Sequence, residues 1–229
     1  MLGKIPFLLF ILMAGLSWAQ PMYGVDFGAQ SQYVNRGAVY DENIVLWPDA
    51  WVSYKGFTAV AFANASTSDM VVNEADLFLS WNTTTGVVTD TVGVSVLTFP
   101  GTGLSPTVEL SLAVAGAPLS WLSLSSAIRV DVMDAPGGVY GTVGAAMAHE
   151  AKGIGLSLRS WVGLVNSKEA EYLYGVAYTG WSDISWSLGV SKTWGALTAT
   201  LYINATRRAW EISSDRGVSW AGMNIGYVL

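Results

Sequence analysis

The sequence predicts an all-β protein, an antiparallel transmembrane β-barrel of about 12 strands, and three observations support this class. Apolar residues alternate with small or polar residues along most of the chain. The chain is 52% apolar and 12% charged, yet beyond its N-terminal segment it lacks an apolar run of the roughly 20 residues that a spanning helix needs. Short turns alternate with longer, more polar loops. In lipid, such a chain satisfies its backbone hydrogen bonds only as a closed barrel.

Residues 91–115 show the alternation most clearly. Val92, Val94 and Val96 share one parity, and after a Pro-Gly reversal at residues 99–103 the same alternation resumes over residues 107–115. Successive side chains of a strand point to opposite faces, so each run has one apolar face and one small or polar face. The two runs therefore predict a hairpin with one apolar side.

The same pattern gives the other strands in chain order. We expect the strands at residues 22–33, 44–54, 57–66, 74–81, 92–97, 107–115, 122–132, 139–148, 156–164, 166–194, 197–203 and 223–229. The pattern does not assign the two faces of residues 57–66. Apolar residues between 166 and 194 fall on even positions, including Tyr172, Tyr174 and Tyr178. That stretch is either one long strand with an outer excursion or two strands that turn at Gly180, in which case the barrel has 14 strands.

The connections alternate in length. Short turns are expected at residues 55–56, 83–86, 116–118, 152–153 and 194–195, and longer polar loops at 34–43, 66–73, 100–106, 166–171 and 206–216. Short periplasmic turns that alternate with longer outer loops are typical of a transmembrane barrel. A soluble secreted β-sandwich also alternates, but its outer face would carry Lys, Glu and Thr. Here the second face is mainly Gly, Ser, Thr and Ala, which favours a narrow lumen.

The N-terminal segment indicates export. Lys4, the apolar residues 5–16 and the Ser-Trp-Ala at 17–19 match a cleaved signal peptide over residues 1–19, which leaves residues 20–229 as a single barrel domain. We expect the mature chain in the bacterial outer membrane. The net charge of −6 offers no basic stripe for nucleic acid, and the absence of cysteine excludes thiol chemistry.

The isolated charges of the second face are the candidate functional residues. Because Arg or Lys facing lipid costs about 2–4 kcal/mol at mid-depth, we expect charges in the strands to face the lumen. The lumen and constriction candidates are Asp26, Asp49, Glu74, Asp76, Glu109, Arg129, Asp131 and Arg159, and we assign Lys192 to the same face. Their excess of carboxylates predicts cation selectivity if the barrel conducts. The alternative is that these charges pair and close the lumen.

No catalytic, cofactor or metal site is expected. His149 is the only histidine and lies beside the predicted turn at residues 152–153, where we interpret it as a solvated turn residue. A triad needs a nucleophile and an orienting group around such a histidine, and the sequence supplies no such arrangement. Glu74 and Asp76 alone are too few ligands for a calcium site. We therefore expect no enzyme.

Several short motifs resemble the TorF-like porin family of bacterial outer-membrane β-barrels. The resembling residues lie in the first half of the chain, in the expected order: Ser31-Gln32-Tyr33-Val34-Asn35-Arg36-Gly37, Glu74 with Asp76, Val92-Gly93, Phe99-Pro100-Gly101 and Glu109. Two positions depart from the pattern, because Phe99 stands where a tyrosine is expected and Leu229 where an aromatic residue is expected. The resemblance implies a barrel with porin function.

Two functions stay open at this level. The first is a small porin that passes cations or small polar solutes. The second is a non-conducting structural or adhesive barrel that acts through its outer loops. The expected partners are outer-membrane lipid and lipopolysaccharide, with the barrel-assembly machinery during insertion. The oligomeric state and the solute are left open.

Overall fold

A computed structural model describes residues 20–209, 211–212 and 217–229. The predicted signal peptide, residues 1–19, lies outside the described residues. Within them the elements are β1 (Met22–Gln30), β2 (Tyr33–Asn35), β3 (Ala38–Asp41), β4 (Val45–Tyr54), β5 (Phe57–Ser66), β6 (Val72–Thr85), β7 (Val88–Thr98), β8 (Thr107–Leu119), β9 (Leu122–Asp131), β10 (Val139–Ala151), β11 (Ile154–Val165), α2 (Ser167–Tyr174), β12 (Gly180–Trp194), β13 (Leu197–Arg208) and β14 (Gly217–Val228).

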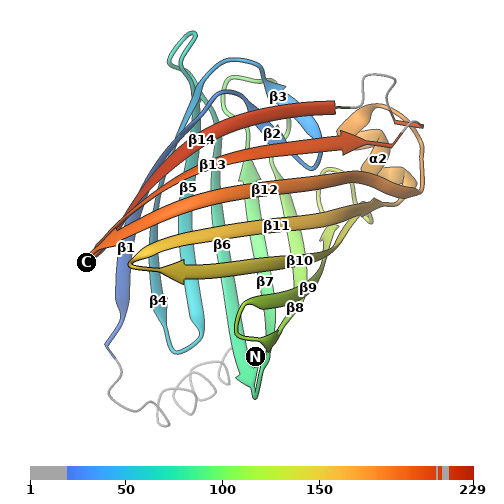
Figure 1. Cartoon of the computed structure of the whole chain (residues 1–229). Coiled ribbons are helices and arrows are strands. Elements are labelled where there is room, and N and C mark those ends of the chain that lie inside the picture. The colour runs from blue at the N-terminus through green and yellow to red at the C-terminus, as the bar shows by residue number, and fades with distance from the viewer. Residues whose placement is uncertain (1–19, 210, 213–216) are drawn as a thin grey trace, which may run out of the picture.

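The long strands close into a single antiparallel barrel (Figure 1). The order around the barrel is β1-β14-β13-β12-β11-β10-β9-β8-β7-β6-β5-β4, which confirms the predicted 12 strands. β1 closes the sheet because it pairs with β14 on one side and with β4 on the other. The short strands β2 and β3 form a separate two-stranded sheet, which we call the hairpin, residues 33–41.

The two ends of the barrel differ. At the turn end, where β1 begins and β14 finishes, neighbouring strands are joined by turns of two residues such as Lys55–Gly56 and Lys152–Gly153. The hairpin, α2 and the longer loops lie at the opposite end, the loop end (Figure 1). The tight turn expected at residues 116–118 is wrong by a few positions, because β8 continues to Leu119 and the chain turns at residues 120–121.

Residues 166–178 do not form the strand that their even-numbered apolar pattern suggested. They contain α2, which begins after the N-cap Asn166 and ends at the C-cap Gly175, whose φ is +72°. The Asn166 side chain accepts a hydrogen bond from the Glu169 backbone N–H at 3.0 Å, which satisfies a free donor of the first helical turn. Local capping overrides the period-two pattern here.

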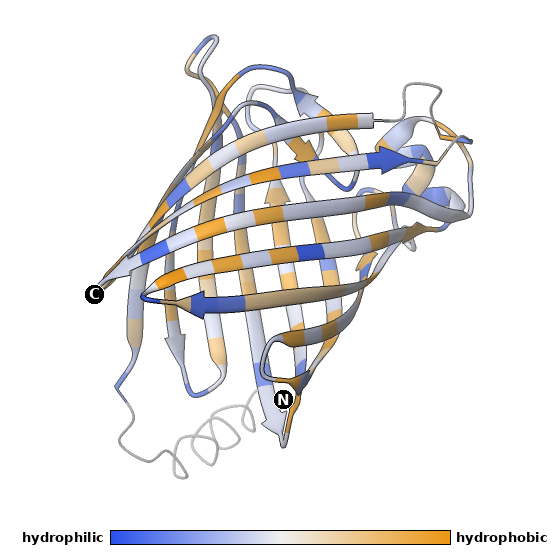
Figure 2. Cartoon of the chain, viewed as in Figure 1, coloured by the Kyte–Doolittle hydropathy of each residue, from blue (hydrophilic) through white to orange (hydrophobic). Residues whose placement is uncertain are grey.

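The outer wall of the barrel is apolar along every strand. Leucine, isoleucine and valine side chains project from it, and Leu201, for example, is 64% exposed. Figure 2 shows the resulting bands of apolar and polar residues that alternate along the strands. A continuous exposed surface of this kind suits lipid and not water. None of the helices in the described part of the chain is long and apolar enough to cross a membrane.

The inner wall combines aromatic rings with glycines. A Cβ atom on Gly28 would lie 2.0 Å from Trp47 Cε2, and one on Gly24 would lie 2.3 Å from Trp51 Cζ2. The two tryptophans of β4 therefore occupy the space that side chains on β1 would need. This close approach explains why the lumen parity of β1 carries glycine at both positions.

The facing of β13 gives a direct test of the barrel. Leu201 lies on the outer wall, whereas Thr200 faces the lumen opposite Ser191 and Asn224. Leu201→Arg should lower the free energy of unfolding by about 2–4 kcal/mol, because it places a charge in lipid near mid-depth. Thr200→Arg, the matched control, should change it by less than about 1 kcal/mol. Urea unfolding in lipid vesicles, followed by heat-modifiable gel mobility, measures both, and equal losses would contradict this facing.

Candidate functional site

The hairpin enters the mouth of the barrel and occupies its lumen. Its strands pair from Tyr33–Asp41 to Asn35–Ala38, and Arg36 and Gly37 make a two-residue turn with φ of +50° and +76°. Positive φ at both positions is what this tight type of turn requires. A Cβ on Gly37 would lie 2.9 Å from Asp183 Cβ, so the turn touches the wall at β12.

The base of the hairpin is bonded to the last strand of the barrel. The Ser31 backbone N–H donates to the Ala221 carbonyl at 2.9 Å, and the Gln32 side chain donates to the Ser219 carbonyl at 2.8 Å. The tip of the hairpin forms its ion pairs with β8 and α2. The hairpin therefore reaches from the β1–β14 seam across the lumen to the opposite wall.

Arg36 holds the tip of the hairpin through two carboxylates, which together we call the Arg36 triad. Its Nη2 lies 2.6 Å from Glu109 Oε1 and 2.7 Å from Glu109 Oε2. Its Nη1 donates to Glu169 Oε1 at 2.6 Å. Glu109 stands on β8 and Glu169 on α2, so one guanidinium joins three separate parts of the chain.

The triad is almost completely withdrawn from water. The side chains of Arg36, Glu109 and Glu169 are 9%, 5% and 2% exposed. The Arg36 guanidinium also lies 5.0 Å from the centre of the Tyr140 ring, and the Tyr174 hydroxyl donates to the Arg36 carbonyl. Burial raises the pKa of Glu169 while Arg36 opposes that shift, so acidification neutralises Glu169 before an exposed glutamate.

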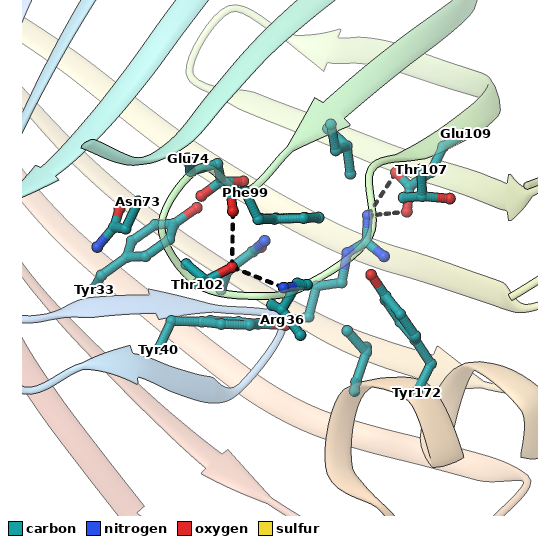
Figure 3. Close-up of a pocket in the computed structure, with 14 residues that line it drawn as sticks. Tyr33, Arg36, Tyr40, Asn73, Glu74, Phe99, Thr102, Thr107, Glu109 and Tyr172 are labelled. Atoms are coloured by element: carbon teal, nitrogen blue, oxygen red, sulfur yellow. Dashed lines mark hydrogen bonds and ion pairs between the residues drawn. The ribbon is translucent and has the colours of Figure 1, made fainter. Parts of the chain in front are cut away.

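An outer cavity of about 410 Å³ lies between the hairpin and the β6–β8 wall. Its lining comprises four aromatic rings, three leucines and a polar set, namely Tyr33, Tyr40, Phe99 and Tyr172, then Leu97, Leu104 and Leu173, then Asn35, Arg36, Asn73, Glu74, Thr102, Thr107 and Glu109. In Figure 3, Tyr33 and Glu74 lie on one side of it and Arg36 with Glu109 on the other, and Tyr172 approaches from α2.

Two inner cavities lie on the far side of the hairpin, toward the turn end. The inner acidic cavity, about 370 Å³, is lined by Glu74, Asp76 and Glu109 among others. The inner basic cavity, about 360 Å³, is lined by Arg129 and Arg159 together with Tyr140, Trp161 and Trp220. Arg36 and Arg129 line both inner cavities. The lumen below the hairpin thus has one acidic wall and one basic wall.

The structure groups five of the sequence-derived candidates around the hairpin. Glu74, Asp76, Glu109 and Arg129 line the inner acidic cavity, and Arg159 joins Arg129 in the inner basic cavity.

The other three candidates line neither inner cavity, although Asp131 is the cross-strand partner of Glu109. Asp131 is buried and accepts a hydrogen bond from the Thr107 hydroxyl at 2.7 Å, so it braces the wall. Asp26 on β1 and Asp49 on β4 are opposite each other in the strand register, in the barrel wall away from the hairpin. Asp26 accepts a hydrogen bond from Trp51 Nε1 at 3.1 Å.

The assignment of Lys192 to the lumen is wrong. Lys192 has the parity of Leu188 and Val190, whose side chains are exposed on the outer wall. Its ammonium group donates to the Lys152 carbonyl at the turn end of the barrel, where a long side chain reaches water.

Two residues of the site escaped the sequence analysis as candidates. Arg36 lies in a loop that the alternation pattern does not describe, and Glu169 lies in residues 166–171, which the pattern predicts as an outer loop or excursion without a role for any single residue. A local signal for Glu169 exists, since Asn166 followed three residues later by Glu169 is a helix-capping pattern. No local signal identifies Glu169 or Glu109 as the partner of Arg36, because the partners are 133 and 73 residues away.

No metal cluster is present among the described residues, where no group of three or more His, Cys, Asp or Glu is suitably placed. His149 is exposed and lies on β10 next to the turn at Lys152–Gly153. His149 lines none of these three cavities.

Comparisons with known proteins find a shared fold and no shared family. No family model and no curated protein matches the chain. The KdgM porin, also solved in complex with disordered oligogalacturonate, is similar with a TM-score of 0.62 and 11% identity over 89% of this chain and 98% of that one. The NanC porin matches with a TM-score of 0.52 and 11% identity over 90% and 98% of the chains.

A further barrel protein shares the fold as well. LpxR from Salmonella typhimurium matches with a TM-score of 0.52 and 10% identity, over 89% of this chain and 99% of LpxR. At these identities the likeness concerns the fold alone. The chain has the closed 12-strand fold of small outer-membrane β-barrels.

Removal of the central cation tests the Arg36 triad. Arg36→Met keeps much of the side-chain volume but leaves two buried carboxylates without a counter-charge, a loss of about 3–5 kcal/mol. Amide hydrogen exchange at residues 33–41 should accelerate by about 100-fold or more, while the barrel strands keep their protection. Arg159→Met, the control, removes a lumen arginine outside the triad and should leave this segment unchanged. Unaltered exchange in Arg36→Met would show that other contacts hold the hairpin.

Proposed function

We propose that the chain is a small channel of the bacterial outer membrane that passes cations or small polar solutes beside the hairpin. One observation carries the proposal: the outer cavity and the inner acidic cavity lie on opposite sides of the hairpin and share a wall formed by Tyr33, Asn35, Arg36, Glu74, Leu97 and Glu109. A solute would pass along this shared wall. The fold shared with the KdgM and NanC porins supports the same function.

The charge of the shared wall argues for cations. The Arg36 triad has one cationic and two acidic side chains, and its two ion pairs leave Glu74 and the neighbouring Asp76 without an ion pair in the described residues. A narrow lumen with low-dielectric walls focuses their potential and enriches cations. The KdgM porin was solved with oligogalacturonate, which is anionic, and an acidic constriction would repel such a solute.

The charges below the hairpin would also orient a solute. Glu74 and Asp76 stand on β6, while Arg129 and Arg159 stand on β9 and β11 across the lumen. Opposite charges on facing walls create a transverse field, which aligns a dipolar solute as it passes. This arrangement suits small polar molecules as well as ions.

Several further assignments complete this proposal. Residues 1–19 would be cleaved as a signal peptide, and residues 20–229 would insert through the barrel-assembly machinery into a membrane with lipopolysaccharide. The chain would act without enzymatic chemistry, although LpxR shares the fold. Membership of the TorF-like porin family is supported by the position of its motifs, since Arg36, Glu74, Phe99 and Glu109 all line the outer cavity.

The second candidate is a non-conducting barrel that acts through its outer loops. The Arg36 triad favours it, because buried ion pairs hold the hairpin across the lumen. Single-channel recording of the refolded protein in planar bilayers separates the two functions. Discrete currents through the wild-type chain support the channel, and a silent wild-type barrel that conducts only after deletion of residues 33–41 supports the closed barrel.

Selectivity gives a quantitative test. The double variant Glu74→Gln, Asp76→Asn should lower the cation-to-anion permeability ratio by about twofold or more at 0.1 M salt, with a smaller effect at 1 M because screening is stronger. The control Asp69→Asn, Asp90→Asn removes the same charge from exposed positions outside the lumen and should leave the ratio unchanged. Reversal potentials across a salt gradient measure both. Anion selectivity in the wild-type channel contradicts this account.

A further inference from the structure

The outer cavity has the composition of a ligand site and not only of a passage. Four aromatic rings, from Tyr33, Tyr40, Phe99 and Tyr172, line a space of about 410 Å³, within the range of cavities that hold small organic molecules. The rings come from β2, β3, the loop after β7 and α2, so four separate parts of the chain converge on one space. A water-filled passage for ions alone has no need of such a set of apolar and aromatic groups.

The cavity has an uncompensated negative charge. Glu74 is only 6% exposed and borders the cavity beside Tyr33 (Figure 3). In the described part of its lining, Arg36 is the one cationic side chain, and its two ion pairs go to Glu109 and Glu169. Glu74 therefore faces the cavity without a positive partner, among aromatic rings whose faces also attract cations.

We propose that the outer cavity binds a small organic cation, an ammonium compound with an apolar or aromatic body. Glu74 would accept a charge-assisted hydrogen bond from the ammonium group, and Asn35 lines the same cavity from the hairpin with a neutral amide. The tyrosine rings would contact the apolar body and add cation–π attraction. This inference names a solute class for the proposed channel and rests on that proposal.

The other solute charges fit the cavity less well. A neutral molecule of the same shape would fill the aromatic space but leave the buried Glu74 carboxylate without a counter-charge. An anion would meet Glu74 while Arg36 is already engaged with Glu109 and Glu169. The site is therefore tested by comparing its affinities for a cation, a neutral molecule and an anion of the same shape.

The site also depends on the hairpin being in place. Tyr33 and Tyr40 belong to the hairpin and Tyr172 to α2, and the Arg36 triad joins these two segments to the wall. A ligand that contacts all of them binds the seated hairpin and not a displaced one. Binding should therefore slow hydrogen exchange at residues 33–41, as any ligand of one conformation stabilises that conformation.

Calorimetric titration of the full folded barrel in detergent micelles tests this inference, with empty micelles as the blank. The probes are benzylammonium, benzyl alcohol and benzoate, which share one aromatic body and carry positive, zero and negative charge. We expect benzylammonium to bind at least about tenfold more tightly than either of the others. Equal binding of benzyl alcohol, tighter binding of benzoate, or no binding of benzylammonium overturns the proposal.

Two matched variants locate the site. Glu74→Gln should weaken benzylammonium binding by about tenfold and leave benzyl alcohol unaffected, because only the charge is removed. Asp49→Asn removes a carboxylate from the barrel wall outside the outer cavity and should change neither. Equal effects of the two variants contradict a site at Glu74. The assay needs no ion flow, so a barrel that binds benzylammonium but is silent in bilayers overturns the channel alone.

Discussion

The positions of the segments at the loop end of this barrel depend on the ion pairs of the buried Arg36 guanidinium. A single arginine forms ion pairs with one carboxylate from the wall and with one from the helix of an outer loop, and each of the three groups would be costly to bury alone. Arginine suits this position because its planar fork donates in two directions at once, which a lysine ammonium does with less geometric definition. The hairpin, α2 and β8 therefore occupy fixed positions relative to one another, and the cavities between them have defined walls.

The barrel itself can be predicted from the sequence, because the residues that face lipid and lumen alternate with a regular period. Lipid outside and a polar lumen inside impose a two-residue alternation, and this pattern alone predicts the eight lumen candidates. The alternation fails where the chain leaves the sheet. Residues 166–178 keep apolar residues on even positions, but the cap at Asn166 and the αL residue Gly175 decide the local structure. The error at Lys192 has a different origin, because a long side chain near the rim tolerates the outer face.

The arrangement of the hairpin and the Arg36 triad could not be predicted from the sequence, because it consists of long-range contacts. The alternation predicts Glu109 as a lumen charge, but its partner lies 73 residues earlier in a loop, and only the folded barrel brings the two together. The hairpin packs against lumen walls whose residues are small or polar. Its own sequence therefore cannot be distinguished from that of a solvent-exposed loop. The family-like motifs were informative for this reason: they marked, one by one, residues that prove to share a cavity.

The anchoring of the hairpin base on β14 ties the hairpin to the closure of the barrel. Ser31 and Gln32 bond to carbonyls of Ala221 and Ser219, residues almost 190 positions later in the chain. These bonds need the first and last strands of the barrel to be paired with each other. A long-range pairing of this kind is slow to form. The contacts at the base of the hairpin therefore depend on the pairing of β1 with β14, whereas the Arg36 triad at its tip involves only β8 and α2. Closure of the barrel and the seating of the hairpin base thus involve one and the same contact region, the seam between the first and last strands.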